Sequence, residues 1–109
     1  GQLSITAPVT VIADAVYVLT SPRLYGVPRS MVGELLSVLV RLLGFKIRHR
    51  RAVLRALELY ASANVDFSDA LIAAEMERSG SRVVCSYDAD FDRIPTIKRV
   101  PPRQLLAQQ

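Results

Sequence analysis

The sequence has one cysteine, no tryptophan and no apolar run long enough to cross a bilayer. Its single thiol, Cys85, excludes an intrachain disulfide and is typical of a protein from a reducing compartment. The longest apolar run, from Leu35 to Phe45, is interrupted by Arg41 and Gly44, whereas a membrane span needs about 18 apolar residues in a row. A basic leader followed by a short apolar stretch is also lacking. We therefore expect a cytoplasmic protein without a membrane partner.

Charged residues are few as well, at 22% of the chain, while 50% of the residues are hydrophobic. This composition is typical of a packed domain and not of a disordered tail. We expect a single domain over residues 1–109, with residues 103–109 as a flexible tail. The formal net charge of +4 fits a polyanionic partner or an acidic protein, but small basic proteins are common and the charge alone decides nothing.

Covalent catalysis by a side chain is not indicated. His49, the single histidine, lies in a basic segment with no acidic neighbour to orient it. Cys85 ends the apolar run Val83–Cys85, which predicts a buried and unreactive thiol.

Hydrophobic periodicity predicts helices separated by short strands. Gly44 and Asn64 are the end signals of two of the helices. The segment 82–86 has two valines between turn signals, a pattern typical of a strand buried on both faces. The predicted helices are 7–20, 29–43, 50–63 and 66–79; the predicted strands are 45–48, 82–86 and 96–100, with a turn at 88–95. This order is an α/β pattern, but strands so few and short cannot cover these amphipathic helices, so the sheet is expected to be incomplete.

Asp14 stands within the apolar stretch of the helix predicted at 7–20. An ionised carboxylate in such company is costly unless it is solvated, paired or bound to a cation. Its neighbours at i±3 and i±4 include no lysine or arginine. Asp14 is therefore either a solvent-facing residue on a half-buried helix or part of a site.

Two further aspartates, Asp66 and Asp69, stand at the start of the helix predicted at 66–79. Asp66 as N-cap and Asp69 as its capping-box partner would explain both residues without any function. Small and apolar residues follow Asp69 at positions 70, 73 and 76, however, so its side of the helix can lie against the core or a cleft. One carboxylate can cap while the other faces a site.

Asp88, Asp90 and Asp92 alternate just after the predicted strand 82–86. Ligands bind at the carboxyl ends of strands in open α/β sheets. The spacing also matches the opening of an EF-hand, but the glycine and the glutamate that such a calcium loop needs are both replaced by arginine. The remaining alternative is a turn whose aspartates cap a short helix.

Combined, these acids support a metal site in which one cleft gathers Asp14, Asp69 and Asp88. Two carboxylates about 4 Å apart repel by roughly 4 kcal/mol at an effective dielectric of about 20, so such a cluster must take up a proton or a divalent cation. Mg²⁺ and Mn²⁺ favour all-oxygen sites. An ion held in this way polarises a phosphodiester and activates water, so that hydrolysis needs no histidine.

Three segments that carry these acids resemble successive blocks of PIN-domain proteins, in order and at the family's spacing. They are Ala13–Leu19 (ADAVYVL), Asp66–Ala74 (DFSDALIAA) and Val84–Pro95 (VCSYDADFDRIP). The resemblance covers residues 5–102 and is strongest in the last two blocks. It implies a three-layer α/β fold with a short parallel sheet flanked by helices. It also implies a Mg²⁺- or Mn²⁺-dependent ribonuclease, of the kind that is the toxin in VapBC-type toxin–antitoxin pairs, with RNA and an antitoxin protein as partners.

The same resemblance assigns roles to the acids by position. Asp14 stands where the family usually has glutamate, and aspartate reaches one methylene less far. Asp66 is left as a helix cap. The implied catalytic metal ligands are Asp14, Asp69 and Asp88, with Asp90 as an auxiliary ligand and Ser86 as a supporting residue.

One departure from the family lies at the start of the sequence. PIN domains open with a hydrophobic strand that ends in the first of their acids and is normally central in the sheet, and this sequence starts after it. Either the chain is a fragment or a second chain supplies the strand, and the apolar surface left without it favours a homo-oligomer. We therefore expect these 109 residues alone to bind metal weakly and to cut RNA poorly or not at all.

The densest group of basic residues either steers RNA phosphates toward the acids or forms a solvated face. No aromatic residues interleave with its arginines, so base stacking is not indicated there. The residues predicted to bind RNA are Lys46, Arg48, Arg50 and Arg51.

Two functions from different classes therefore remain. One is a metal-dependent nuclease. The other is a non-catalytic PIN-like module that binds nucleic acid or protein, which the missing first acid and the aspartate at position 14 favour.

Overall fold

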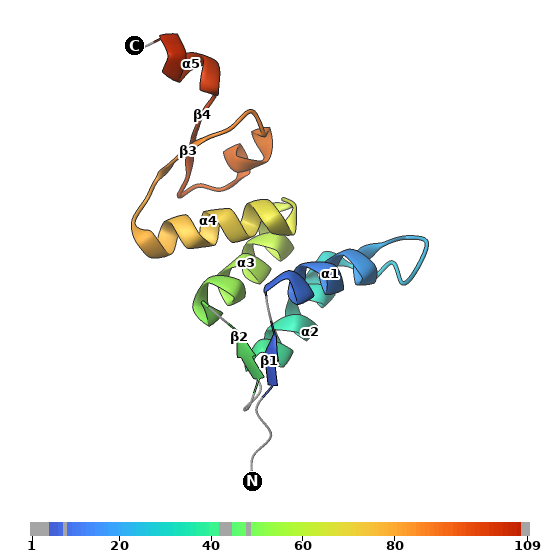
Figure 1. The fold of residues 1–109 in the computed structure, drawn as a ribbon. Helices are drawn as coiled ribbons and strands as arrows, with labels where there is room; N and C mark the ends of the chain where they lie inside the picture. The colour runs from blue at the N-terminus through green and yellow to red at the C-terminus, as the bar shows by residue number, and fades with distance from the viewer. Residues whose placement is uncertain (1–4, 8, 42–44, 48, 108–109) are drawn as a thin grey trace.

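The computed structural model describes residues 5–7, 9–41, 45–47 and 49–107, and over them the chain is an α/β protein (Figure 1). Helices predominate, and each described strand is three residues long. The elements in chain order are β1 (Ile5–Ala7), α1 (Val9–Thr20), α2 (Arg29–Arg41), β2 (Phe45–Ile47), α3 (Arg50–Ala63), α4 (Phe67–Ser79), β3 (Val83–Cys85), the 3₁₀ helix η1 (Ala89–Arg93), β4 (Lys98–Val100) and α5 (Pro102–Ala107).

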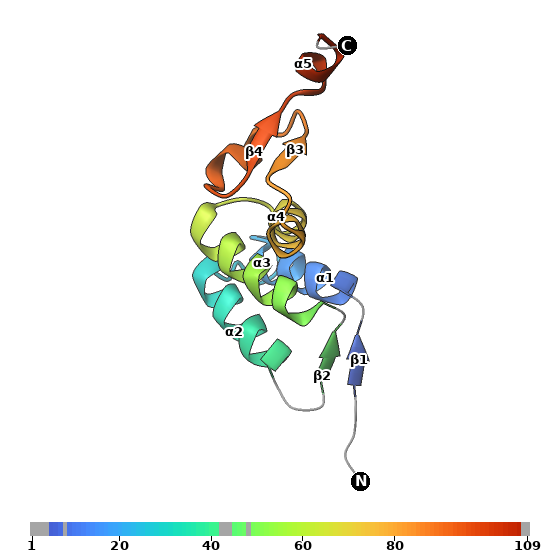
Figure 2. The same ribbon diagram turned by 90° about the vertical axis from the view of Figure 1, so that its left-hand side faces the viewer.

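Helix α3 is the centre of the hydrophobic core, because it packs against both α2 and α4 (Figure 2). Val53, Ala56 and Leu57 of α3 are fully buried. Helix α2 contributes Val32 and Val40, which are equally buried. These residues recur every three or four positions, which is the amphipathic pattern expected of helices with one apolar face.

Helices α3 and α4 each end at a residue in the left-handed conformation, at the positions that the sequence predicted. Helix α3 ends at Asn64, which has a φ of 54° and is one of the residue types that tolerate this conformation. Helix α4 ends at Gly80, with a φ of 81°, and the following Ser81 N–H donates to the Met76 carbonyl at 2.9 Å. The chain reverses sharply after Asn64, so α4 begins beside the end of α3.

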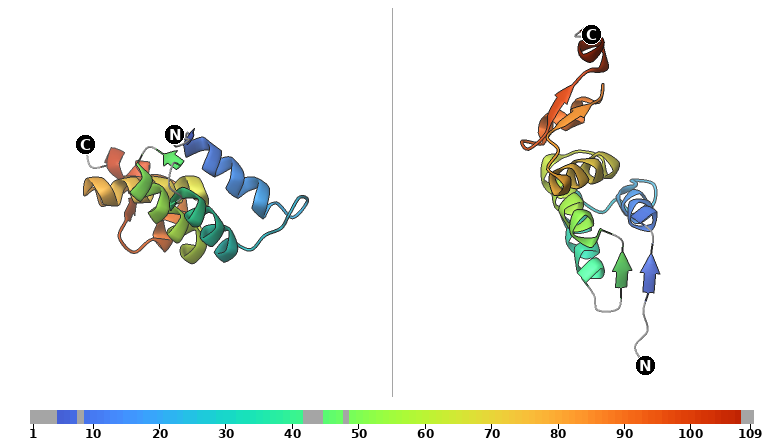
Figure 3. Two further views of the ribbon diagram at one scale, coloured as in Figure 1. Left: turned by 90° about the horizontal axis from the view of Figure 1, so that it is seen from below. Right: turned by 60° about the vertical axis from the view of Figure 1, so that its left-hand side comes forward.

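The described strands form two separate two-stranded sheets. β1 pairs with β2 and β3 pairs with β4, in parallel in both cases. The two sheets lie at opposite ends of the molecule with α3 and α4 between them, as Figure 3 also shows. The molecule is therefore elongated, measuring 58 × 34 × 19 Å. The predicted α/β class and the predicted parallel pairing of strands are confirmed. The described strands form two separate sheets, however, and not the single sheet that was expected.

The structure also corrects the sequence prediction at β1 and β3. The sequence predicted no strand at Ile5–Ala7, which forms β1. Residues Pro102–Ala107 form helix α5, and the flexibility expected of residues 103–109 stays a prediction. β3 is not buried on both faces, because Val83 is 57% exposed. Cys85 is exposed too, so the prediction of a buried thiol is wrong. The predicted helix and strand ends at residues 42–44 and 48 lie outside the described residues.

Helix α2 carries apolar side chains on its outer face as well as its inner one. Met31, Leu35 and Val38 are 53%, 55% and 59% exposed. Their spacing of four and three residues places them in one stripe along the helix. Such a stripe is typical of a surface that meets another protein.

Among the described residues, no helix combines the length and the apolarity needed to cross a membrane.

Gly33 sets the distance between α2 and α3. A Cβ atom at this position would lie 3.1 Å from the Ala61 Cβ and 3.3 Å from the Leu57 carbonyl oxygen. Both distances are shorter than ordinary van der Waals contacts, so the two helices approach one another closely because residue 33 has no side chain.

Replacing Gly33 by valine should lower the free energy of unfolding by about 1–3 kcal/mol, because the added methyl groups overpack the contact between α2 and α3. Urea denaturation followed by circular dichroism measures the change. The matched control is Glu34→Val on the exposed face of the same helix, which should change the free energy by less than about 1 kcal/mol. Equal losses in the two variants would show that the close approach at residue 33 is not the cause.

Candidate metal centre

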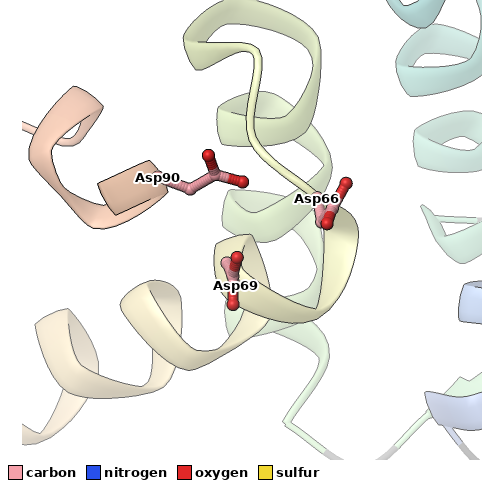
Figure 4. Close-up of side chains that lie close together, drawn as sticks. All are labelled: Asp66, Asp69 and Asp90. Carbon is pink, nitrogen blue, oxygen red and sulfur yellow. The ribbon is translucent and has the colours of Figure 1, made fainter. Parts of the chain in front are cut away.

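Three aspartates from two elements meet at the start of α4, as Figure 4 shows. Asp66 and Asp69 belong to the beginning of α4, and Asp90 comes from η1. Each offers a carboxylate oxygen, and these oxygens all lie within 4.8 Å of one another. Asp69 is buried, Asp90 is half-buried and Asp66 is exposed, so this acid cluster of Asp66, Asp69 and Asp90 is open to solvent on one side.

The turn between α3 and α4 places two members of the acid cluster. After Asn64 the chain buries Val65 and sets Asp66 at the N-cap position of α4 with an extended backbone. Asp69 follows three residues later, so both carboxylates lie on the same side of the first helical turn. The unpaired N–H groups and the helix dipole at this end favour negative charge.

The loop after β3 places the third member. The Asp88 N–H donates to Ser86 Oγ at 3.0 Å, and the Asp90 N–H donates to Asp88 Oδ1 at 2.9 Å. These hydrogen bonds fold the segment into a tight turn that starts η1. Phe91, which is 2% exposed, anchors η1 in the hydrophobic core. The position of Asp90 thus depends on the side chains of Ser86 and Asp88.

Arg93 joins η1 to the turn between α3 and α4. Its Nη1 donates to Asp90 Oδ1 at 2.8 Å and to the Asn64 carbonyl oxygen at 3.0 Å. Arg29, at the start of α2, donates from its own Nη1 to the Val65 carbonyl oxygen at 2.8 Å. The turn that brings the acids together is therefore held by two arginines from different parts of the chain.

Burial and neighbouring groups shift the pKa values of Asp69 and Asp88 in opposite directions. The pKa of Asp69 is raised to about 6, mainly because burial disfavours its charged form, and the nearby carboxyl groups of Asp88, Asp90 and Asp66 add to this effect. The pKa of Asp88 is lowered, first by the hydrogen bond from the Asp90 N–H and then by a hydrogen bond with Asp69. Asp69 therefore carries the shared proton below about pH 6, and negative charge accumulates at the start of α4 above it.

The donor set of the acid cluster fits a hard divalent cation. Its ligand atoms are carboxylate oxygens, which Mg²⁺ and Mn²⁺ prefer. Burial and the nearby carboxyl groups both disfavour the charge on Asp69, and a bound cation would offset both effects. Asp66, Asp69 and Asp90 would hold such an ion, with Asp88 beside them.

The structure brings some of the predicted site residues together and leaves one apart. Asp69 and Asp90 are in the acid cluster, and Asp88 lies close enough to Asp69 to raise its pKa. Ser86 lies beside Asp88 and accepts its N–H. Asp14 is exposed on α1 and is not a member of the cluster, so the part predicted for it in the metal site has no support from this geometry.

Asp66 is the member that the sequence prediction left out. It takes the predicted N-cap position, but its side chain makes no capping hydrogen bond and lies in the acid cluster. Its i, i+3 spacing to Asp69 was the available signal. Asp92 differs, because Arg99 donates to its two carboxylate oxygens at 3.0 and 3.1 Å. Asp92 therefore helps to hold the loop and not an ion.

The predicted RNA-binding residues lie at the far end of α3. Arg50 and Arg51 are exposed at the start of this helix, whereas the acid cluster lies past its end, roughly 20 Å away along the axis. The side chain of Lys46 and the whole of Arg48 lie outside the described residues. The two arginines are thus too far from the acids to contact the same phosphate group.

The geometry defines an α/β protein with a carboxylate site next to the carboxyl end of a parallel strand. A scan against protein-family models matches the PIN domain over residues 4–97, which is most of the chain. The chain therefore belongs to the PIN-domain family, a nuclease-type family, and the resemblance seen in the sequence is confirmed at the level of the family. Searches of curated proteins and of solved structures gave no match.

Replacing Asp69 by asparagine should stabilise the protein at about pH 8 in the presence of a chelator. The pKa of Asp69 is above its unfolded value, so the folded state binds the proton more tightly, and the stability of the native protein falls as the pH rises through about 6. We expect the variant to gain about 1–3 kcal/mol in free energy of unfolding at high pH and nothing below about pH 4.

Thermal unfolding at the two pH values measures this difference. Asp14→Asn is the matched control, because Asp14 is exposed on α1, and it should change the free energy by less than about 0.5 kcal/mol. A loss of stability in Asp69→Asn at high pH would contradict the repulsion among the acids.

Proposed function

We propose that the protein hydrolyses phosphodiester bonds in RNA with Mg²⁺ or Mn²⁺ bound at the acid cluster. The observation that carries this proposal is the approach of three carboxylates to within 4.8 Å of one another at the start of α4. Membership of a nuclease-type family supports it. When bound, such an ion polarises the phosphodiester and lowers the pKa of water.

The chain's own residues have distinct tasks in this proposal. Asp66, Asp69 and Asp90 hold the ion. The lowered pKa of Asp88 keeps this carboxylate ionised beside them, where it adds to the negative potential that attracts the cation. Arg93 binds Asp90 and thereby keeps η1 against the start of α4.

No nucleophilic side chain of the protein is needed, and water is the attacking group. His49 precedes α3, at the end remote from the acid cluster. Cys85 is exposed on β3 and is not part of the cluster. This distribution supports hydrolysis and argues against a covalent enzyme intermediate.

A protein partner is part of the same proposal. The exposed apolar stripe of Met31, Leu35 and Val38 on α2 supports association, either with an antitoxin or with a second copy of the chain. A toxin of a toxin–antitoxin pair needs such a surface for its inhibitor. The toxin role itself rests on the resemblance of the sequence blocks.

The second candidate is a PIN-like module that binds nucleic acid or protein without cutting it. The exposed position of Asp14, outside the acid cluster, favours this alternative. So does the separation of the sheets, because β1 and β3 each pair on one edge only among the described residues and a further strand would be needed to join them. We expect on this ground that the 109 residues alone cut RNA poorly or not at all. Strong Mn²⁺-dependent cleavage by the purified chain, abolished in Asp69→Asn, would contradict that expectation.

Calorimetric titration with Mn²⁺ separates the two candidates. A metal-dependent nuclease should bind Mn²⁺ saturably, and Asp69→Asn and Asp88→Asn should each weaken binding by about tenfold or more. Glu34→Gln on the exposed face of α2 is the control and should leave the affinity unchanged. Unchanged affinity in Asp14→Asn would remove Asp14 from the site, and absence of binding at millimolar Mn²⁺ would favour the module.

The affinity for Mn²⁺ should also fall as the pH drops through about 6, because a proton on Asp69 competes with the ion. Well below that pH the apparent dissociation constant should rise about tenfold per pH unit. Titrations in a series of buffers measure this dependence. An affinity that stays constant from about pH 5 to about pH 7 would contradict the assignment of Asp69 as a ligand.

A further inference from the structure

A hollow lies at the carboxyl edge of the β3–β4 sheet, beside the loop that carries Asp88. It has a volume of about 420 Å³, within the range of sites that hold small ligands. Its lining residues are Tyr87, Pro101, Arg103 and Gln104. It thus combines an aromatic ring, a cation and an amide in one place.

The parallel register explains why these residues meet. Cys85 pairs with Val100 at the end of the sheet, so the residues that follow each strand emerge at the same edge. The Ser86 N–H donates to the Val100 carbonyl oxygen at 3.1 Å, which extends the pairing by one step. Tyr87 follows Ser86 and Pro101 follows Val100 in the chain. Figure 1 shows the loop after β3 and helix α5 on that side of the sheet.

Tyr87 has no task in the hydrophobic core. Its side chain is 68% exposed. Tyr60 differs, because it is buried, lies edge-on to Phe67 and has the Arg29 guanidinium over its ring at 4.4 Å. The Tyr87 ring is therefore available to a flat partner from outside the molecule.

The hollow is also fixed relative to the acids. Tyr87 immediately precedes Asp88, and the hydrogen bond from the Asp88 N–H to Ser86 Oγ closes the backbone around Tyr87. Asp88 in turn accepts the Asp90 N–H. A ligand on the Tyr87 ring would thus be held one residue away from the group that contacts Asp69.

We propose that this hollow receives an unpaired base of single-stranded RNA, which stacks on Tyr87 while Arg103 contacts a neighbouring phosphate and Gln104 contacts the edge of the base. The inference rests on the proposed function, since it makes the hollow the subsite that positions the strand beside the acid cluster. Aromatic rings bind unpaired bases of any sequence by stacking, and arginine adds a charge contact to the backbone. The site lies away from the basic group at the start of α3, where no aromatic residue interleaves with the arginines.

Fluorescence anisotropy of a labelled single-stranded oligoribonucleotide tests the proposal in the presence of a chelator, so that no cleavage occurs. Tyr87→Ala should weaken binding by about 5- to 150-fold, the range measured for loss of one stacked base, whereas Tyr87→Phe should keep the affinity within about twofold. Tyr17→Ala is the matched control, because Tyr17 is 74% exposed on α1 and should have no effect. Equal effects of Tyr87→Ala and Tyr17→Ala would overturn the proposal.

Two further ligands identify what the hollow binds. An abasic oligomer of the same length should bind the native protein as weakly as the normal strand binds Tyr87→Ala, and a duplex RNA should gain nothing from Tyr87. Arg103→Gln should reduce the slope of log affinity against log salt concentration by about one. Tyr87-dependent binding of the duplex or of the abasic strand would show a different ligand and overturn the proposal.

Failure of this subsite is distinguishable from failure of the nuclease. Asp69→Asn should keep the Tyr87-dependent binding in chelator, because Asp69 holds the ion and not the base. A protein that shows this binding but no Mn²⁺ binding would retain the subsite and lose the proposed catalysis. A protein that binds Mn²⁺ through Asp69 but binds RNA equally with and without the Tyr87 ring would retain the metal site and lose the subsite.

Discussion

The mutual repulsion of the carboxylates at the start of α4 is the constraint on which the rest of the site depends. Asp66, Asp69 and Asp90 approach to within 4.8 Å although Asp69 is buried. The pKa of Asp69 is raised to about 6, first by burial and then by the neighbouring carboxyl groups. The fold maintains this arrangement through the Arg93 hydrogen bonds to Asp90 and Asn64. Arrangements that store repulsion in this way are typical of functional sites and not of scaffolds.

The packing of the helices explains where the acids of the cluster lie. Helix α3 packs against both its neighbours and ends at Asn64, so α4 must begin where η1 also arrives. The β1–β2 half of the sheet takes no part in this, because it lies at the other end of the molecule. The acid cluster is thus assembled by the helical core and the β3 loop, while Asp14 on α1 stays outside it.

The helices and the third block of acids could be predicted from the sequence, because both depend on local spacing. The ends of α3 and α4 follow from Asn64 and Gly80, which adopt left-handed backbones. The exposure of Cys85 could not be predicted, since a short apolar run does not reveal whether a neighbouring strand or helix covers it. Asp66 was assigned to capping because capping was locally sufficient, and its place in the acid cluster depends on η1, which Arg93 holds nearby and which local spacing does not position.

The central claim is that the acid cluster binds a divalent cation, and paramagnetic broadening by Mn²⁺ in NMR spectra of the labelled protein tests it most directly. Substoichiometric Mn²⁺ should first broaden the amide signals of Asp66, Asp69 and Asp90, and those of Asp14 and Glu34 should broaden last. Excess Mg²⁺ should restore the signals. Broadening that begins elsewhere, or that spreads evenly over the exposed acids of the surface, would contradict the claim.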